Sequence, residues 1–326
     1  DKPVIDIDDA EDKRAVIERI LQSRPAKSAE GYRRIWDPVR GSPLLYHTED
    51  LAARLQDALG ERYDVCIGFQ YSEPSMESAL TRLMSLHAER IILVPMFPHF
   101  AEATVGAFLA NASRTAARLG CASYLQVVPP FYKSPAFIDA AQRLIGESVG
   151  PAGREVDHVV FSFHGIPERQ CMRTDETGSI CMKVPDCCTR RCEATRNCYR
   201  AQCLETARLL AESLGLPDGR WSAAFQSRKA VRGSIRWTRP YTDELLAELP
   251  ARGLRRVAVC APSYTVDCIE TLGELGHDGR ELFEAAGGSE LVLVPCLNAC
   301  ETWARGLAHL IRRPPTADRA GGHWAM

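Results

Sequence analysis

The sequence has no large excess of either charge. Its 40 Lys and Arg residues nearly balance its 42 Asp and Glu residues, which leaves a formal net charge of −2. The two signs are mixed along the chain, and no polybasic block stands out. Proteins that bind nucleic acid or an anionic membrane electrostatically need a concentrated basic surface. The composition therefore indicates no nucleic-acid partner and no electrostatic membrane anchor.

Long apolar runs are also missing. The chain is 45% hydrophobic, yet charged residues interrupt each apolar stretch before it reaches the length of a membrane-spanning helix. No basic segment followed by an apolar one opens the sequence, as a secretory signal would. We therefore expect a cytoplasmic protein. Disulfides are rare in that reducing compartment, where clustered cysteines more often bind metal or act in catalysis.

Cysteine is the residue that the chain does concentrate. Seven of its 13 cysteines lie close together, at Cys171, Cys181, Cys187, Cys188, Cys192, Cys198 and Cys203. Their spacing lacks the paired C-x2-C units of a zinc ribbon. Four thiolates on such a loop can instead hold a [2Fe–2S] cluster. A loop clamped by zinc is the alternative.

Strand-like and helix-like segments alternate along most of the chain. The apolar patterns predict strands at 63–69, 90–95, 123–129, 158–163, 221–226, 255–261 and 290–295. Helices are expected at 74–88, 102–118, 135–147, 199–214, 242–249, 267–286 and 300–312. Two more helices come first, one that ends at Pro25 and one that begins at about Thr48. This alternation is typical of βαβ units with parallel strands.

We therefore predict an α/β fold built from two doubly wound, Rossmann-like domains. The Pro-rich stretch from Pro129 to Pro135 is the natural join. It divides the chain into an N-terminal domain of residues 1–131 and a C-terminal domain of residues 132–326. The second domain would carry the cysteine-rich insert at about 171–203.

Chemically useful side chains follow two of the predicted strands. One strand ends in His164-Gly165-Ile166-Pro167, and another leads into a helix with Glu270 and Glu274 on one face. Open α/β sheets bind ligands at the carboxyl ends of their strands. A histidine nitrogen and a carboxylate that meet there can hold Fe²⁺ or take protons from a substrate. The alternatives are a structural histidine and a solvated acidic face.

Longer stretches around these residues resemble one enzyme family. SFHGIPER and, downstream, DCIETLGEL resemble the signature pair of ferrochelatases, and AEGYRRIWDPVRGSPL, GFQYSEPSMESAL and LVPMFPHFAEATVGAF agree with it. The resemblance covers nearly the whole chain. It implies insertion of Fe²⁺ into a porphyrin, either protoporphyrin IX or coproporphyrin III, during haem synthesis. It also implies two Rossmann-like domains that face each other across the porphyrin cleft.

The resemblance further implies catalytic and metal-binding roles for four residues. His164 matches the histidine that takes pyrrole protons or contacts the metal, and Glu270 matches the carboxylate opposite it. Asp267 and Glu274 match acidic positions that lead from the site toward solvent and pass metal or protons. All four are therefore candidates to contact the metal.

Other residues match the surfaces that bind the porphyrin. Tyr32, Arg33 and Arg34 match a lip segment where a guanidinium can bind a propionate. Tyr71 matches an aromatic residue of the pocket wall. Gln70 departs from the pattern, because relatives often carry Arg there and a neutral amide cannot hold a propionate by charge. An apolar product is compatible with peripheral membrane contact, and both a monomer and a homodimer are open.

Some bacterial ferrochelatases resemble this chain in carrying a [2Fe–2S] cluster on an internal insert. On that pattern the cluster ligands are Cys181, Cys187, Cys188 and Cys198. Cys171 and Cys192 are candidates to replace one of them. Cys203 is the weakest candidate, since cluster-free relatives often have cysteine at that position.

Two other interpretations remain. The family opens with a strand of the LLVNLGTP kind, which this sequence lacks. That departure and Gln70 would suit a degenerate chelatase fold that senses iron or redox state, or that only binds porphyrin. A cobalt or nickel chelatase is the other interpretation, but those enzymes use pairs of histidines, and only His164 is in place here. The intact His164 and Glu270 favour a ferrochelatase.

Overall fold

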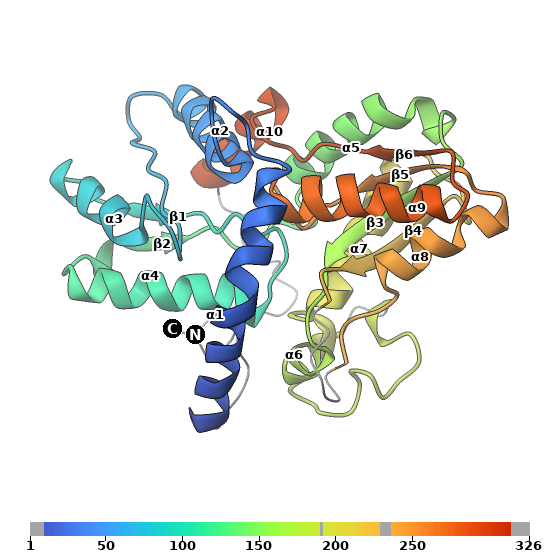
Figure 1. Cartoon of the computed structure of the whole chain (residues 1–326). Coiled ribbons are helices and arrows are strands. Elements are labelled where there is room, and N and C mark those ends of the chain that lie inside the picture. The colour runs from blue at the N-terminus through green and yellow to red at the C-terminus, as the bar shows by residue number, and fades with distance from the viewer. Residues whose placement is uncertain (1–9, 190–191, 229–235, 314–326) are drawn as a thin grey trace.

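The structure is a computed structural model that describes residues 10–189, 192–228 and 236–313. A two-stranded sheet pairs β1 (Ile91–Leu93) with β2 (Leu125–Val127) (Figure 1). A four-stranded sheet is formed by β3 (His158–His164), β4 (Trp221–Gln226), β5 (Arg256–Cys260) and β6 (Glu290–Leu293). Neighbouring strands in both sheets run parallel. The predicted α/β class with parallel sheets is confirmed.

Helices cover the sheets. They are α1 (Ala10–Arg33), α2 (Pro43–Leu59), α3 (Met76–Ser85), α4 (Ala107–Arg118), α5 (Pro135–Val149), α6 (Glu168–Arg173), α7 (Tyr199–Ser213), α8 (Thr242–Glu248), α9 (Arg280–Ala285) and α10 (Glu301–Arg312). Two π-helical segments, Glu102–Gly106 and Ile269–Gly279, lead into α4 and α9. Such segments are rare and often lie at functional sites. Within the described ranges, no helix combines the length and the apolar character needed to cross a membrane.

The four-stranded sheet has the order β4-β3-β5-β6. From β3 the chain moves to β4 on one side, and then returns to place β5 on the other side of β3. The strand order therefore reverses between β3 and β5. Open α/β sheets bind their ligands at such a switch point, outside the carboxyl ends of the strands. Segments 164–167 and 261–270, which follow β3 and β5, lie at that point.

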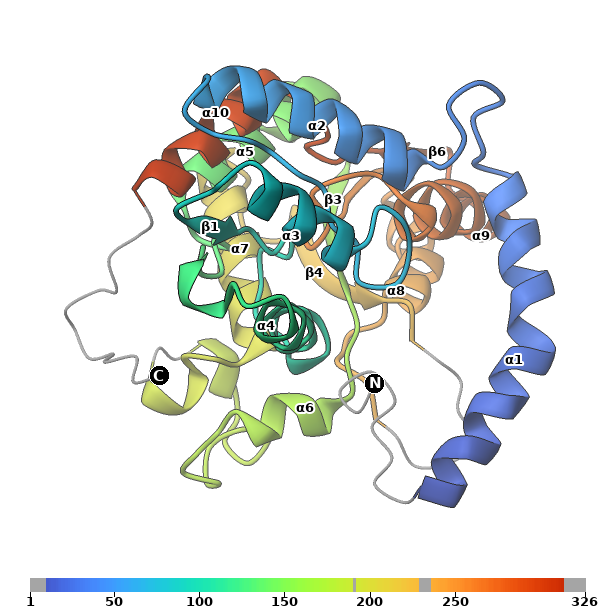
Figure 2. The ribbon, with the colours of Figure 1, turned by 90° about the vertical axis from the view of Figure 1, so that its left-hand side faces the viewer.

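The core joins elements from both ends of the chain. The rings of Phe131, Phe137 and Trp303 pack against one another, and all three are buried. Trp303 lies on α10, which contacts both α5 and α2 (Figure 2). The last helix therefore packs on an early element of the predicted first domain. The division at residues 131 and 132 stays a prediction.

Two helix boundaries were predicted wrongly. α1 does not end at Pro25 but continues to Arg33. A proline inside a helix removes one backbone hydrogen bond and crowds the preceding turn, yet α1 continues and packs along the π-helical segment Ile269–Gly279. α2 begins at Pro43 rather than at about Thr48. Proline suits the first turn of a helix, where its missing N–H would have no helical partner.

The predicted strand at 63–69 was also wrong. Of this segment only Phe69 makes a bridge, with Ser75, and no named strand covers it. The Gln56 side chain of α2 takes the segment's polar groups instead: it accepts from the Val65 N–H at 2.9 Å and donates to the Tyr63 carbonyl at 2.7 Å. Backbone groups that are satisfied by a side chain need no strand partner.

Phe161 tests the role of β3 as the centre of the larger core. Its side chain is fully buried and packs against the ring of Trp221. We expect Phe161→Ala to lower the free energy of unfolding by about 3–5 kcal/mol, because it leaves a cavity. Leu21→Ala on α1, where the side chain is 63% exposed, should change it by less than about 0.5 kcal/mol. Urea unfolding measures both, and equal losses would contradict the prediction.

Candidate active site and thiol cluster

Hydrogen bonds fix both the backbone and the ring of His164, the last residue of β3. Its N–H donates to Ser263 Oγ at 3.0 Å, and its carbonyl accepts from the Tyr199 hydroxyl at 2.8 Å. Its ring Nδ1 lies 2.6 Å from the Gly165 carbonyl oxygen. Because a carbonyl can only accept, Nδ1 carries the proton and Nε2 keeps a free lone pair. Nε2 is therefore the nitrogen that can act as a base or a ligand.

Gly165 and Gln226 join the end of β3 to the neighbouring segments. The Gly165 N–H donates to the Gln226 carbonyl at 2.8 Å, and a Cβ on Gly165 would lie only 2.9 Å from that oxygen. The Gln226 amide accepts from Ser162 at 2.8 Å and donates to the Glu270 carbonyl at 2.7 Å. This buried side chain therefore ties β3 and β4 to the π-helical segment that carries Glu270.

Glu270 lies in the first turn of that segment. Its Oε2 is 3.0 Å from the sulfur of Cys268. Burial, and then the negative charge of Glu270, raise the pKa of the Cys268 thiol well above its ordinary value. The thiol therefore keeps its proton and donates to the carboxylate. The sequence analysis assigned no role to Cys268, although it stands between Asp267 and Glu270.

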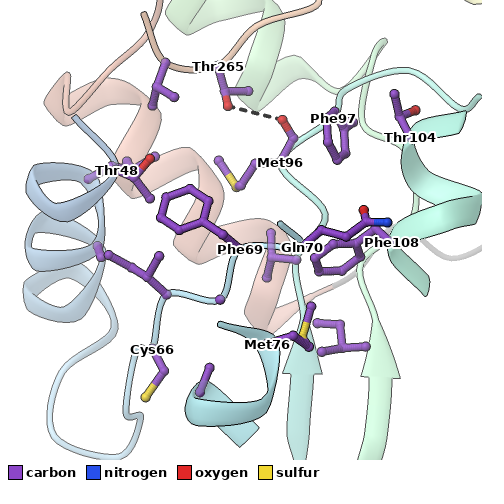
Figure 3. Close-up of a pocket in the computed structure, with 18 of the residues that line it drawn as sticks. Thr48, Cys66, Phe69, Gln70, Met76, Met96, Phe97, Thr104, Phe108 and Thr265 are labelled. Carbon is purple, nitrogen blue, oxygen red and sulfur yellow. Dashed lines mark hydrogen bonds between the residues drawn. The ribbon is translucent and has the colours of Figure 1, made fainter. Parts of the chain in front are cut away.

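His164 and Glu270 line one cavity of about 1830 Å³ between the two halves of the molecule. Its wall is mostly apolar and is built from many segments of the N-terminal half, as the labelled side chains of Phe69, Met76 and Met96 show (Figure 3). Concave, largely apolar sites with a few polar groups are typical of small-molecule binding. The two residues that the sequence singled out are thus brought to one site.

The other two acidic candidates are held by hydrogen bonds. Asp267 is buried, and its carboxylate accepts from Thr271 at 2.8 Å, Asn298 at 2.7 Å and the Cys296 N–H at 3.2 Å. Glu274 accepts from the N–H of Ser227 at 2.6 Å and from its hydroxyl. Neither is among the described residues that line the cavity.

The predicted porphyrin-binding residues divide into two groups. Tyr32 and Tyr71 line the cavity, as does Gln70. Burial, and then the negative charge of Glu270, raise the pKa of the Tyr32 hydroxyl. Arg33 pairs with Glu30 at 2.6 Å, and Arg34 pairs with Asp278 at 2.7 Å. Both arginines therefore already have carboxylate partners.

The insert gathers six buried thiols. Five belong to the four predicted ligands and one of the spare cysteines, Cys181, Cys187, Cys188, Cys198 and Cys171, and the sixth is Cys203 on α7. Hydrogen bonds from Cys171, Cys181 and Cys188 lower the pKa of Cys198. The sulfurs of Cys187 and Cys188 lie 3.7 Å apart. No set of three or more His, Cys, Asp or Glu side chains in the described ranges is arranged as a metal site, yet the chemistry of the donors fits an iron–sulfur cluster.

Charged groups organise the loop that carries these thiols. The Arg200 guanidinium donates to the sulfur of Cys188 at 3.0 Å. The Asp175 carboxylate accepts from the N–H groups of Thr177, Ile180 and Cys181 at 2.7–3.0 Å. These bonds, together with one from the Thr177 hydroxyl, lower the pKa of Asp175 to about 2. A cation beside a sulfur and a fixed loop would both suit a bound anionic cluster.

His99 is a buried histidine in the cavity wall that the sequence analysis passed over. Its Nε2 lies 2.9 Å from Thr206 Oγ1, and that hydroxyl donates to the Tyr132 carbonyl at 2.8 Å. His99 Nε2 must therefore donate. Its ring packs edge-on against Tyr199. Burial lowers the pKa of His99 to about 3.

The sequence is similar to known proteins over most of its length. A family model described as Ferrochelatase matches residues 1–314. The chain belongs to the ferrochelatase family. It is 41% identical over 309 residues to the ferrochelatase of Pseudomonas fluorescens (strain Pf0-1). This alignment covers 94% of this chain and 87% of that protein. Membership makes the chain an enzyme of haem biosynthesis that inserts a metal into a porphyrin, with Fe²⁺ as a substrate.

Further ferrochelatases are as similar. That of Azotobacter vinelandii (strain DJ / ATCC BAA-1303) is 42% identical over 307 residues, covering 93% of this chain and 87% of that protein. That of Bdellovibrio bacteriovorus is 41% identical over 293 residues, covering 90% of this chain and 84% of that protein. The predicted family is thus confirmed, and with it metal insertion into a porphyrin.

Solved chelatase structures share the fold. One is CbiX, the terminal enzyme for biosynthesis of siroheme in denitrifying bacteria, with a TM-score of 0.51 over 85% of this chain and 95% of that chain. Another is the sirohydrochlorin chelatase SirB from Bacillus subtilis subspecies spizizenii in complex with cobalt, with a TM-score of 0.52 over 84% and 91%. Each is 14% identical to this chain, so the likeness concerns the fold alone. It agrees with the predicted two-domain chelatase fold.

The buried His99 predicts how the enzyme responds to acid. Its pKa is about 3 in the folded protein and has an ordinary value of 6.5. Between these two pH values His99 is therefore mostly protonated in the unfolded chain and mostly neutral in the folded chain. The stability that His99 contributes is therefore complete above pH 6.5 and is lost as the pH falls from 6.5 toward 3, by about 2 kcal/mol at pH 5.

His99→Gln removes this titration and can keep the hydrogen bond to Thr206. We expect the variant to be less stable than the parent at pH 8 and the difference in free energy of unfolding to shrink at pH 5. Urea unfolding at both pH values measures the difference. A difference that stays constant would contradict the prediction.

Proposed function

We propose that this enzyme inserts Fe²⁺ into protoporphyrin IX or coproporphyrin III within the cavity, with His164 and Glu270 as its catalytic residues. The observation that carries the proposal is that both side chains line one cavity at the switch point of the sheet. Two pyrrole protons must leave the porphyrin for each Fe²⁺ that enters. The site therefore needs a proton acceptor and a group that receives the metal.

His164 is proposed as the proton acceptor. Its Nδ1–H is engaged by the Gly165 carbonyl, which leaves the lone pair on Nε2 for a pyrrole proton or for the metal. A positioned base typically contributes 10²–10⁴-fold to a rate. The same hydrogen bond fixes the ring orientation, so the base does not have to be ordered again in each turnover.

Glu270 is proposed to contact the incoming Fe²⁺ and to take the second proton. Carboxylate oxygen and imidazole nitrogen are both suitable ligands for ferrous iron. The Cys268 thiol holds the Glu270 carboxylate. Asp267 and Glu274 follow along the same segment, and we propose that they support the entry of metal or the exit of protons. The apolar wall would bind the macrocycle and favour its distorted form.

Substrate binding at the cavity mouth is proposed for Tyr32 and Tyr71, which line the cavity. Arg33 and Arg34 would bind a propionate only by exchanging their present carboxylate partners. Trp36, Val39 and Tyr71 are exposed large side chains, which supports peripheral membrane contact by an enzyme with an apolar product. The oligomeric state that we propose is a monomer or a homodimer.

The cysteine-rich insert is proposed to hold a [2Fe–2S] cluster on Cys181, Cys187, Cys188 and Cys198. Five buried thiols and the neighbouring Arg200 support this. Cys171 hydrogen-bonds to Cys198, so it is the candidate to replace one ligand. Cys192 is exposed, which makes it a poorer replacement. When bound, the cluster would supply a one-electron centre and would stabilise the loop by binding.

His164→Ala tests the catalytic assignment. We expect kcat for iron insertion under anaerobic conditions to fall by at least about a hundredfold, with protoporphyrin IX and with coproporphyrin III. Porphyrin binding, followed by quenching of protein fluorescence, should persist because the apolar wall is intact. His309→Ala, an exposed position on α10, is the matched control. Parent-like activity of His164→Ala would exclude the histidine as the base.

Cys198→Ser tests the cluster assignment. The parent should be brown and contain about two irons per chain, as a [2Fe–2S] centre requires. The variant should lose both colour and iron, because it lacks one of the four thiolates proposed to hold the cluster. Cys121→Ser, a buried cysteine in another part of the core, should keep both. A colourless parent that contains zinc would replace the cluster by a zinc-clamped loop.

A further inference from the structure

The backbone of His164 makes two hydrogen bonds that the catalytic roles do not explain. The His164 N–H donates to Ser263 Oγ at 3.0 Å, and the Tyr199 hydroxyl donates to the His164 carbonyl at 2.8 Å. Two side chains therefore hold the peptide groups on both sides of the His164 Cα.

The directions of these bonds are determined by their donors. The His164 N–H can only donate, so Ser263 Oγ accepts from it. The His164 carbonyl can only accept, so Tyr199 gives it its hydroxyl proton. Loss of either hydroxyl leaves one side of the His164 backbone without its partner.

The two bonds join three parts of the fold. His164 ends β3, and Ser263 lies in the turn that leads from β5 toward Glu270. Tyr199 is the first residue of α7 and directly follows Cys198, a buried thiol of the insert. Tyr199 is 5% exposed, and its ring is held against His99. The proposed cluster ligand and the proposed base are therefore two short steps apart.

We propose that Tyr199 and Ser263 are positioning residues that hold His164 for metal insertion, and that Tyr199 transmits the state of the thiol cluster to His164. The inference rests on the proposed roles of His164 and of the cluster. Binding at Cys198 fixes the start of α7 and, with it, the Tyr199 hydroxyl. Release of the cluster would free that helix end and weaken the hold on the His164 peptide.

Tyr199→Phe and Ser263→Ala test the two bonds. Each single variant should lower kcat for iron insertion by about ten- to a hundredfold, while the KM for the porphyrin stays within about a factor of two. Parent-like kcat in both single variants would overturn the proposal.

Tyr241→Phe is the matched control for loss of a buried tyrosine hydroxyl. Its hydroxyl donates to the Trp237 carbonyl at 3.5 Å and not to His164. Its kcat should match that of the parent. Hydrogen exchange gives a readout apart from activity: the His164 amide should exchange faster in Tyr199→Phe and in Ser263→Ala, and as in the parent in Tyr241→Phe. Unchanged exchange in both Tyr199→Phe and Ser263→Ala would overturn the positioning role.

Chelator treatment tests the link to the cluster. Removal of the cluster, followed by its visible absorbance, should speed exchange of the His164 amide in the parent but add little in Tyr199→Phe. An equal effect in both proteins would overturn the transmission through Tyr199. Failure of the proposed function gives a different pattern, because His164→Ala would then keep its activity. A parent without any cluster overturns the transmission, while the kinetics of Tyr199→Phe and Ser263→Ala still decide the positioning role.

Discussion

The meeting of β3 and β5 at the switch point is the constraint on which the site depends. Only there do the end of a strand with His164 and the turn with Ser263 lie side by side, so that one hydroxyl can accept from the His164 N–H. The approach of β4 is equally close, since a Cβ on Gly165 would clash with the Gln226 carbonyl. Parallel pairing thus converts three distant segments into one cavity wall.

Hydrogen bonding, rather than charge pairing, orients the groups in this wall. His164 is held by its own ring nitrogen and by its peptide, and Glu270 is held by the Cys268 thiol and through its backbone by Gln226. In an apolar cavity such bonds are strong, and an unpaired ion would be costly. The arginines of the lip, by contrast, are exposed and paired with nearby carboxylates. Exposed pairs of this kind contribute little to stability.

The thiol-rich insert is connected to this wall rather than attached to it as a separate module. α6 begins at Glu168, directly after the His164–Pro167 turn, and α7 begins at Tyr199 after the last thiol of the loop. The insert therefore leaves and re-enters the fold within reach of His164. Its own geometry depends on Asp175, which holds the Cys181 backbone, and on Arg200 at the Cys188 sulfur.

The sequence by itself determined the family, the parallel α/β class and most strands, because β3 and β5 are buried apolar runs and the motifs at their ends are long. It also indicated His164 and Glu270. It misjudged the segment at 63–69, whose β-like pattern is satisfied by the Gln56 side chain, and it ended α1 at Pro25, which the helix continues past.

Only the tertiary structure determined which distant residues contact one another in the site. Tyr199, Ser263 and Gln226 stand in the sequence as ordinary polar residues, and Arg34 as a free cation. Their roles arise from partners 35 to 244 positions away. A hydrogen bond acts over about 3 Å, so only the folded chain determines which of these groups meet.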